Sequence, residues 1–237
     1  MPVYRLPESD IAFPDPSEAE PDGLLGIGGI LSPESVVTAY CAGIFPWYSQ
    51  NNPPLWWSPD PRCILVPEEF HLPRSLARTL KSGKFSFSFD RAFAQVIQGC
   101  ARPRTKSDGT WLVAEMIDVF ISLHRLGLAH SVETWHDGKL VGGLYGLALG
   151  RVFFGESMFF QHPDASKAAL AHLLPRLRAA SFTLVDCQQT TANLLRFGAR
   201  DVRRTEFLAR LEKALDGPLP RGSWRSGIPL IVPRTTG

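Results

Sequence analysis

Acidic and amide side chains occur inside two apolar, strand-like stretches of the sequence. Glu156 follows Phe153-Phe154-Gly155, and Asp186 and Gln188 come at the end of the run that begins at Phe182. Burying such groups costs free energy unless a partner or a ligand satisfies them. On a continuing strand, Asp186 and Gln188 face the same side and place an acceptor beside a group that both donates and accepts. This pair could accept a hydrogen bond from an amine and hold an ester or amide carbonyl.

Aromatic and methionine side chains frame Glu156, so its carboxylate is expected to face a pocket and to recognise a cationic ligand. A purely structural explanation exists for each group. Backbone amides could satisfy Glu156, and Asp186 with Gln188 could cap the helix that follows. Ser157 does not have both glycines of the G-x-S-x-G nucleophile elbow, because Phe159 occupies the second glycine position, and it has no assignable His–Asp pair, which argues against a serine nucleophile.

The segment between these two stretches predicts a single helix. Asp164 is its expected N-cap, and four leucines between 170 and 177 form its apolar stripe. We expect the first strand to end near Glu156 and the second to run over 182–186. In a strand–helix–strand unit the carboxyl ends of the strands lie side by side, where open α/β sheets hold their ligands. The pattern therefore predicts that Glu156 and Asp186 share one site.

Strands and helices are also predicted around this unit. Ser32 is the expected N-cap of a helix with Pro33 in its first turn, and Asp90 is expected to cap another. Asp137-Gly138 is typical of a hairpin turn between strands over 130–135 and 140–149. We further expect an extended arm over 1–22, a turn over 26–29, an aromatic loop over 45–62, a strand over 85–89, helices over 111–126 and about 206–216, and a frayed tail over 218–237.

Composition and length fit an ordinary soluble protein of 237 residues, with one large domain or two small ones. No apolar run approaches the roughly 20 residues that span a bilayer. The N-terminus lacks the pattern of a signal peptide, so a cytoplasmic location is expected. The four cysteines form no C-x-x-C pair, and the six histidines show no metal-ligand spacing. We therefore expect reduced thiols and no metal site.

Charge is distributed unevenly along the chain. Residues 1–23 contain six acids against one base, whereas residues 71–106 contain eight bases against Asp90 alone. Such an excess can attract a polyanion, because neutralised phosphates release counterions. The alternative is a solvated basic face without a partner. The loop tryptophans over 45–62 could likewise form a small core or stack on nucleic-acid bases.

Six motifs in one order resemble the leucyl/phenylalanyl-tRNA–protein transferases, the bacterial aminoacyltransferases of the N-end rule. The resemblance covers about residues 4–210. Ile30 departs from it, because an acidic residue is expected there. The motifs are Asp22-Gly23-Leu24-Leu25-Gly26-Ile27-Gly28-Gly29, Tyr40-Cys41-Ala42-Gly43-Ile44-Phe45-Pro46-Trp47, Trp57-Ser58-Pro59-Asp60-Pro61-Arg62, Thr110-Trp111, Phe154-Gly155-Glu156-Ser157-Met158-Phe159 and Val185-Asp186-Cys187-Gln188.

The resemblance implies an α+β fold with a small N-terminal domain, including the acidic arm, over 1–62. A larger acetyltransferase-like (GNAT) domain, with a mixed sheet flanked by helices, would cover 63–217, followed by a Pro/Gly/Arg-rich tail over 218–237. The implied reaction moves Leu or Phe, and less readily Met, from aminoacyl-tRNA to the α-amine of proteins beginning with Arg or Lys. The chain lacks the R/Q-x-x-G-x-G/A loop that holds coenzyme A in GNAT enzymes, and no ATP, metal or other cofactor is expected.

The resemblance also assigns roles to individual residues. Asp186 and Gln188 would be catalytic, with Asp186 orienting or accepting through Gln188, and Glu156 would bind the acceptor. Whether Asp186 is a base or the terminal adenosine carries the proton stays open. A coenzyme-A acetyltransferase and a non-catalytic RNA-binding module are the rival interpretations. The implied aminoacyl pocket comprises Leu144, Phe153, Met158, Leu170 and Val185, the implied adenosine contacts are Trp47 and Trp111, and the implied phosphate contacts are Arg74, Arg78, Lys81, Lys84, Arg102 and Arg104.

Overall fold

The structure is a computed structural model that describes residues 3–9, 12–102, 112–217 and 222–228 of the chain. Its N-terminal part forms a four-stranded sheet in the order β1-β2-β4-β3. A 3₁₀ turn, η1 (Pro16–Glu18), lies between the first two strands. The other elements are β1 (Tyr4–Leu6), β2 (Leu24–Gly28), α1 (Pro33–Cys41), β3 (Phe45–Pro46) and β4 (Leu55–Trp57).

This small sheet corrects three sequence predictions. The arm over 1–22 contributes β1, which pairs in parallel with β2. Residues 24–28 form a strand rather than a turn, and the turn is confined to Gly28 and Gly29, whose φ angles are 89° and 78°. The predicted aromatic loop contains the strands β3 and β4. Trp56 of β4 is fully buried, and its Nε1 donates to the Gly28 carbonyl of the neighbouring strand β2 at 2.9 Å, which holds the loop in the sheet. Short pairings of this kind have little sequence signal.

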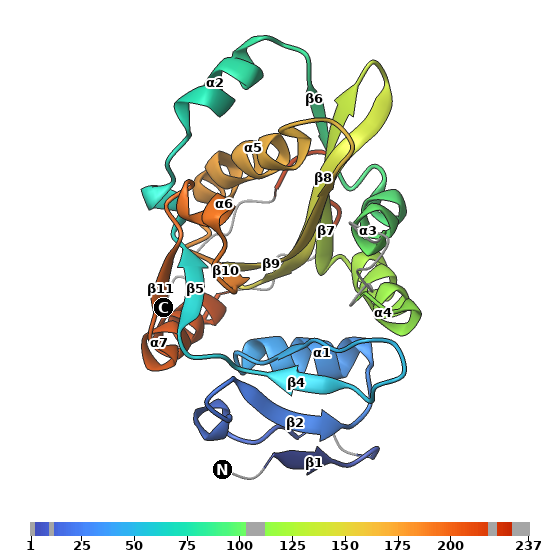
Figure 1. Cartoon of the computed structure of the whole chain (residues 1–237), viewed down its shortest axis with the longest axis vertical. Coiled ribbons are helices and arrows are strands. Elements are labelled where there is room, and N and C mark those ends of the chain that lie inside the picture. Colours follow the sequence, from blue (N-terminus) through green and yellow to red (C-terminus); the bar gives the residue numbers. More distant parts are fainter. Residues whose placement is uncertain (1–2, 10–11, 103–111, 218–221, 229–237) are drawn as a thin grey trace, which may run out of the picture.

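Helix α1 begins as predicted. Ser32 accepts from the Ser35 amide and Ser35 reciprocates, with Pro33 in the first turn. The buried face of α1 carries Tyr40, which shares one apolar cluster with Phe154 of the larger domain. Figure 1 shows α1 between the small sheet and the larger domain. The helix therefore joins the two parts through a common core.

The larger domain is built on a seven-stranded sheet in the order β11-β5-β10-β9-β8-β7-β6. Only β9 and β10 pair in parallel, and the other neighbours are antiparallel. The strands are β5 (Arg62–Leu65), β6 (Ser86–Phe89), β7 (Ala129–His136), β8 (Lys139–Leu149), β9 (Val152–Phe160), β10 (Leu184–Gln188) and β11 (Arg200–Val202). The predicted mixed sheet is confirmed.

Helices cover both faces of this sheet (Figure 1). Helix α5 packs on one face, and α3 and α4 pack on the other. Each face of the sheet has its own apolar cluster. The helical elements are η2 (Pro67–Glu69), α2 (Arg74–Lys81), α3 (Phe93–Ala101), α4 (Ala114–Arg125), α5 (Ala165–Ala179), α6 (Ala192–Leu195) and α7 (Arg204–Leu215). No described helix is long and apolar enough to cross a bilayer.

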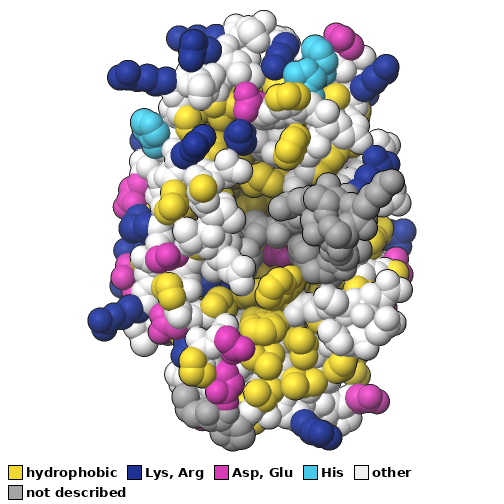
Figure 2. Space-filling model, viewed as in Figure 1, with side chains coloured by type: hydrophobic (Ala, Val, Ile, Leu, Met, Phe, Trp, Pro, Cys, Tyr) yellow, Lys and Arg dark blue, Asp and Glu magenta, His cyan; other side chains and the backbone are white. Residues whose placement is uncertain are grey.

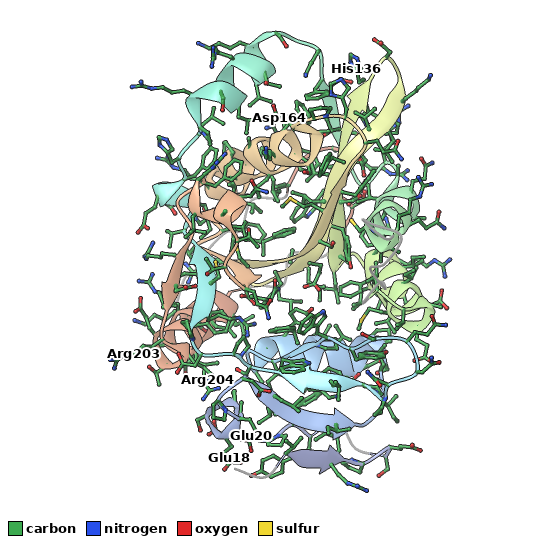
Figure 3. All side chains as sticks on the ribbon, viewed as in Figure 1. Glu18, Glu20, His136, Asp164, Arg203 and Arg204 are labelled. Atoms are coloured by element: carbon green, nitrogen blue, oxygen red, sulfur yellow. The ribbon has the colours of Figure 1, made fainter. Side chains whose placement is uncertain are left out.

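Arg204, at the start of α7, forms hydrogen bonds between the large domain and the small one. Its guanidinium donates to the carbonyl of Ser58 at 2.6 Å and to that of Ser17 at 3.2 Å, and its amide donates to Asp60 Oδ1 at 3.0 Å. Figure 3 shows Arg203 and Arg204 beside the part of the small domain that carries Glu18 and Glu20. The two domains are thus held together by polar contacts as well as by the shared core.

Local sequence signals succeed at the hairpin and fail at two helix starts. Asp137 and Gly138 have positive φ, as a type I′ turn between β7 and β8 requires. Asp164 precedes α5 but makes no capping bond, and its carboxylate binds Lys167 instead. Asp90 does not cap α3, because Glu133 lies there and accepts from the Ala92 amide at 3.3 Å. A cross-strand residue thus replaces the local cap.

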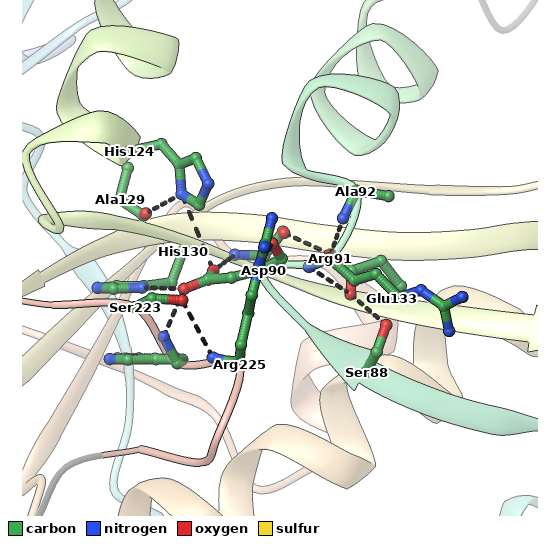
Figure 4. A network of polar contacts seen from close by, with 12 residues as sticks. Ser88, Asp90, Arg91, Ala92, His124, Ala129, His130, Glu133, Ser223 and Arg225 are labelled. Carbon is green, nitrogen blue, oxygen red and sulfur yellow. Dashed lines mark hydrogen bonds and ion pairs between the residues drawn. The ribbon is translucent and has the colours of Figure 1, made fainter.

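The tail prediction is wrong for residues 222–228. Trp224 is fully buried, and its ring stacks on His130 with a centroid separation of 3.9 Å. Its amide donates to Asp90 Oδ2 at 2.6 Å, and Asp90 also accepts from the Ser131 amide at 3.0 Å. Figure 4 shows this network, with Ser223 and Arg225 beside Asp90. Trp224 therefore anchors this otherwise largely exposed segment in the large domain's core.

Candidate active site

Glu156 lies where the parallel strands β9 and β10 part. The last residue pair of these strands is Asp186 with Phe154, and Glu156 and Gln188 each follow two residues later. Strand β9 continues to Phe160, so the expectation that it ends near Glu156 is wrong. It continues because the long strand β8 pairs with it throughout. The strand–helix–strand pattern nevertheless placed the two polar stretches correctly on neighbouring strands.

Both polar stretches coincide with irregularities in strand pairing. Tyr145 pairs with Ser157 whereas Gly146 pairs with Gly155, so Glu156 is the extra residue of a bulge. Along β10 the pairing with β5 shifts between Asp186 and Gln188. Bulges redirect side chains and are frequent beside active sites.

Asp186 is fully buried and is paired with Arg62, which is also fully buried. Arg62 Nε donates to Oδ1 at 2.9 Å and Nη2 donates to Oδ2 at 2.7 Å. Oδ1 also accepts from the Gln188 amide at 3.0 Å. Arg62 is the last residue of the motif that begins at Trp57, and no role was predicted for it from the sequence. A partner of this kind could have been inferred from Asp186, because a buried carboxylate needs a cation beside it.

Gln188 adopts a left-handed backbone conformation with φ of 55°. This region is uncommon for residues other than glycine and often marks functional sites. Its side-chain Nε2 is buried and has no hydrogen-bond partner among the described residues. An amide held in this way can bind a carbonyl or another acceptor of a ligand.

Burial raises the pKa of the Glu156 carboxyl to about 8. The Tyr40 hydroxyl opposes this increase, the charge of Asp186 adds to it, and Arg62 lowers it. Oε1 of Glu156 and the hydroxyls of Tyr40 and Tyr145 are buried without a well-formed hydrogen bond to any described residue. Burial raises the pKa of Tyr40 and of Tyr145, and the nearby charge of Glu156 raises both further. No role was predicted for either tyrosine from the sequence.

The raised pKa of Glu156 makes stability depend on pH. The carboxyl prefers its neutral form in the folded chain and ionises with its ordinary pKa of 4.5 when unfolded, so the stabilisation that this preference provides is lost as pH rises towards 8. We expect this group alone to lower the free energy of unfolding by about 1.4 kcal/mol between pH 7 and pH 9. Glu156→Gln should remove that decrease in denaturant titrations. If the free energy of unfolding fell equally between pH 7 and pH 9 in both proteins, the raised pKa of Glu156 would be contradicted.

The five residues of the implied aminoacyl pocket lie together. Four are buried, Met158 is partly buried, and all belong to one apolar cluster on the α5 face. Leu144 pairs with Met158 across β8 and β9, Phe153 pairs with Val185 across β9 and β10, and Leu170 contributes from α5. The neighbours that alternate with these residues, Tyr145 on β8 and Phe154 on β9, belong to the apolar cluster on the other face of the sheet.

The implied tRNA contacts lie on exposed parts of both domains. Trp47 is 40% exposed and packs edge-to-face with Trp57 at 5.7 Å. Arg74, Arg78 and Lys81 are exposed on α2, Lys84 follows that helix partly exposed, and Arg102 is exposed after α3. Figure 2 shows Lys and Arg side chains around the upper part of the molecule, where α2 lies. Trp111 and Arg104 lie outside the described residues.

Among the described residues, no group of three or more His, Cys, Asp and Glu side chains is arranged to hold a metal ion.

Solved structures of similar fold are distant in sequence. The L-PGS structure from Bacillus licheniformis is 12% identical with a TM-score of 0.40, covering 70% of this chain and 53% of that chain. A GCN5-related N-acetyltransferase from Kribbella flavida is 12% identical with a TM-score of 0.35, covering 70% and 58%. The predicted α+β fold class, a small N-terminal domain with a larger domain built on a mixed sheet flanked by helices, is confirmed by the two sheets and their helices.

Sequence relatives cover nearly the whole chain. A protein of Anaeromyxobacter sp. (strain Fw109-5) is 56% identical over 225 residues, which are 94% of this chain and 95% of the relative. A protein of Desulfatibacillum aliphaticivorans is 52% identical over 225 residues, covering 94% and 96%. Both are named leucyl/phenylalanyl-tRNA–protein transferase.

Family models agree with these relatives. The model of the leucyl/phenylalanyl-tRNA protein transferases matches residues 64–212, and the model of their N-terminal domain matches residues 29–60. Together with relatives more than half identical over almost the entire length, these matches show that the chain belongs to the leucyl/phenylalanyl-tRNA protein transferase family of aminoacyltransferases.

Proposed function

We propose that this protein transfers Leu or Phe, and less readily Met, from aminoacyl-tRNA to the α-amine of proteins that begin with Arg or Lys. The transfer would mark those proteins for N-end rule degradation in the cytoplasm. The observation that carries the proposal is the buried polar site where β9 and β10 part, on strands that also carry Phe153 and Val185 of the apolar cluster on the α5 face. At this site Glu156 Oε1 and Gln188 Nε2 lack partners among the described residues.

The donor ester is already activated, so the enzyme chiefly has to position two substrates and manage one proton. The apolar cluster would receive the aminoacyl side chain. Apolar pockets separate similar apolar side chains by only about 1–3 kcal/mol per methylene, which fits one site for Leu, Phe and Met. Gln188 Nε2, which has no hydrogen-bond partner within the described part of the chain, would donate to the ester carbonyl.

Glu156 would bind the cationic acceptor. A cation that reaches Oε1 favours the carboxylate and lowers the pKa from its value of about 8. Before a cation is bound, that value is close to the pKa of about 7.7–8.0 of an α-amino group, so a proton can move from an approaching α-ammonium group to the carboxylate at little cost. The same carboxylate would thus hold the acceptor and take a proton from its α-ammonium group.

The tRNA would be held by Trp47 and by the exposed bases of α2. An exposed tryptophan offers a stacking surface for the terminal adenosine. Arg74, Arg78 and Lys81 form no ion pair with a described carboxylate, so they are available for phosphates. Phosphate contacts position the tRNA without reading its sequence.

Reversing the charges of α2 is expected to weaken tRNA binding. In the variant Arg74→Glu, Arg78→Glu and Lys81→Glu, the affinity for Leu-tRNA and Phe-tRNA should fall equally. The slope of log affinity against log salt should decrease by about 2–3, because each lost phosphate contact removes about 0.9. Filter binding at several salt concentrations measures both. The control is Arg5→Glu, an exposed base on β1 at the other end of the molecule. An unchanged slope would exclude α2 from the interface.

The proposal is tested by incubating the protein with Leu-tRNA carrying labelled leucine and with matched peptides that begin with Arg or Ala. Label in the Arg peptide alone supports the donor, the acceptor rule and the reaction together. Binding of tRNA without transfer to either peptide would refute the proposal in favour of an RNA-binding protein. Acetyl-coenzyme A binding in calorimetry would instead favour an acetyltransferase.

A further inference from the structure

We propose that Arg62 is a positioning residue for aminoacyl transfer. Through Asp186 it fixes the backbone of Gln188 and thereby directs the side-chain amide of Gln188 into the site. This inference rests on the proposed function and adds a residue from the junction of the two domains to the reaction machinery.

Arg62 is held from several directions at once. Its Cζ lies 4.7 Å from the Phe45 ring centroid and 4.5 Å from that of Phe207, so the guanidinium is placed between two aromatic rings. Its Nη1 donates to the Gly43 carbonyl at 3.3 Å. Gly43 has φ of 77°, and a Cβ there would come within 2.5 Å of Leu208. The guanidinium plane is therefore fixed by both domains before it meets Asp186.

This fixed plane determines the orientation of Asp186. The bonds of 2.9 Å and 2.7 Å from Nε and Nη2 occupy both carboxylate oxygens in a bidentate arrangement. Because Arg62 and Asp186 are fully buried, water does not compete for these bonds. A carboxylate engaged in this way is poorly placed to take a proton from a substrate. Asp186 is better suited to orienting its neighbour than to acting as a base.

The oriented neighbour is Gln188. Its backbone amide donates to Asp186 Oδ1 at 3.0 Å. Both residues are on β10, at the point where the pairing with β5 becomes irregular. This bond supports a backbone with φ of 55°, which is unfavourable for a residue with a side chain. The chain of contacts thus runs from the Arg62 guanidinium through Oδ1 to the Gln188 backbone, and from there to the unpartnered Nε2.

The primary test is Arg62→Lys, which keeps the positive charge and loses the bidentate geometry. We expect the folded variant to show about 100-fold lower kcat in single-turnover transfer at saturating Leu-tRNA, because small displacements of a reacting group have effects of that size. KM for Leu-tRNA should change less than threefold, and the pH profile of kcat should keep its shape. Wild-type kcat in a folded Arg62→Lys variant, or a displaced pH profile, would overturn the proposal.

A matched control separates positioning from general loosening of the interface. Arg204→Gln removes contacts to Ser58 and Ser17 between the same two domains without touching Asp186. It should lower stability and leave kcat within about threefold. A loss of kcat in this control as large as in Arg62→Lys would show that Arg62 acts only through the interface.

A paired variant covers the case in which single variants of Arg62 do not fold. Arg62→Gln with Asp186→Asn removes both charges yet leaves an oxygen that can accept from the Gln188 amide. It should fold and keep kcat within about tenfold of wild type, whereas a folded double variant that loses 100-fold or more would contradict the proposal. The NMR shift of the Gln188 backbone amide should stay near its wild-type position. If wild type transfers no leucine, the proposed function fails while this shift still tests the positioning.

Discussion

Glu156→Gln is expected to reduce kcat/KM for an Arg-initiated peptide by about 1,000-fold at pH 8, within the range that general acid–base groups contribute. The amide has nearly the same size as the carboxyl but can neither hold a cation by charge nor accept a proton. Glu156 is well placed for both roles, because its Oε1 is buried without a partner among the described residues and its pKa is about 8.

The pH profile distinguishes this role from a packing defect. In the wild type, the carboxyl is mostly protonated below pH 8, so kcat/KM should rise with pH as the carboxylate forms. The variant should keep only the pH dependence of the peptide's own α-amine. Measuring kcat/KM from pH 6 to pH 9.5 for both proteins supplies the comparison. Ser157→Ala, beside Glu156 on β9, is the matched control and should retain the wild-type profile. Parallel profiles for Glu156→Gln and wild type would remove Glu156 from proton transfer.

Signals carried within a few residues predicted much of this fold. The Asp137-Gly138 turn, the Ser32 cap and the positions of the long helices follow from local conformational preferences. The juxtaposition of Glu156 and Asp186 followed from one strand–helix–strand unit, since a single crossover fixes which strand ends are neighbours. These features depend on short stretches of chain.

Contacts between segments far apart in the sequence could not be predicted from the local pattern. Arg62 and Asp186 are 124 positions apart, and only the assembled sheet brings β5 beside β10. Asp90 looked like a helix cap because Asp often is one, but its partners come from β7 and the C-terminal segment. The buried hydroxyl of Tyr40 likewise depends on how α1 packs on the larger domain. Polar groups that serve a site are satisfied by the tertiary structure, which the local pattern does not contain.

The C-terminal segment gives the largest expected effect on stability. Trp224→Ala should lower the free energy of unfolding by about 3–5 kcal/mol, as for other fully buried aromatic side chains. The ring stacks on His130 at 3.9 Å and lies 5.9 Å from Phe153 of the implied pocket, so its loss opens a cavity behind that pocket. Trp224→Phe should cost less, because an aromatic ring remains.

Urea titration followed by far-UV circular dichroism measures this effect, with Ser226→Ala as the control because that exposed residue belongs to the same segment. A lower midpoint with an unchanged slope means that the segment unfolds together with the sheet. The Asp90 carboxylate joins the Trp224 amide to the Ser131 amide of β7, which favours this cooperative outcome. An unchanged midpoint for Trp224→Ala would mean that residues 222–228 detach before the domain unfolds. The buried tryptophan would then contribute locally and not to the stability of the core.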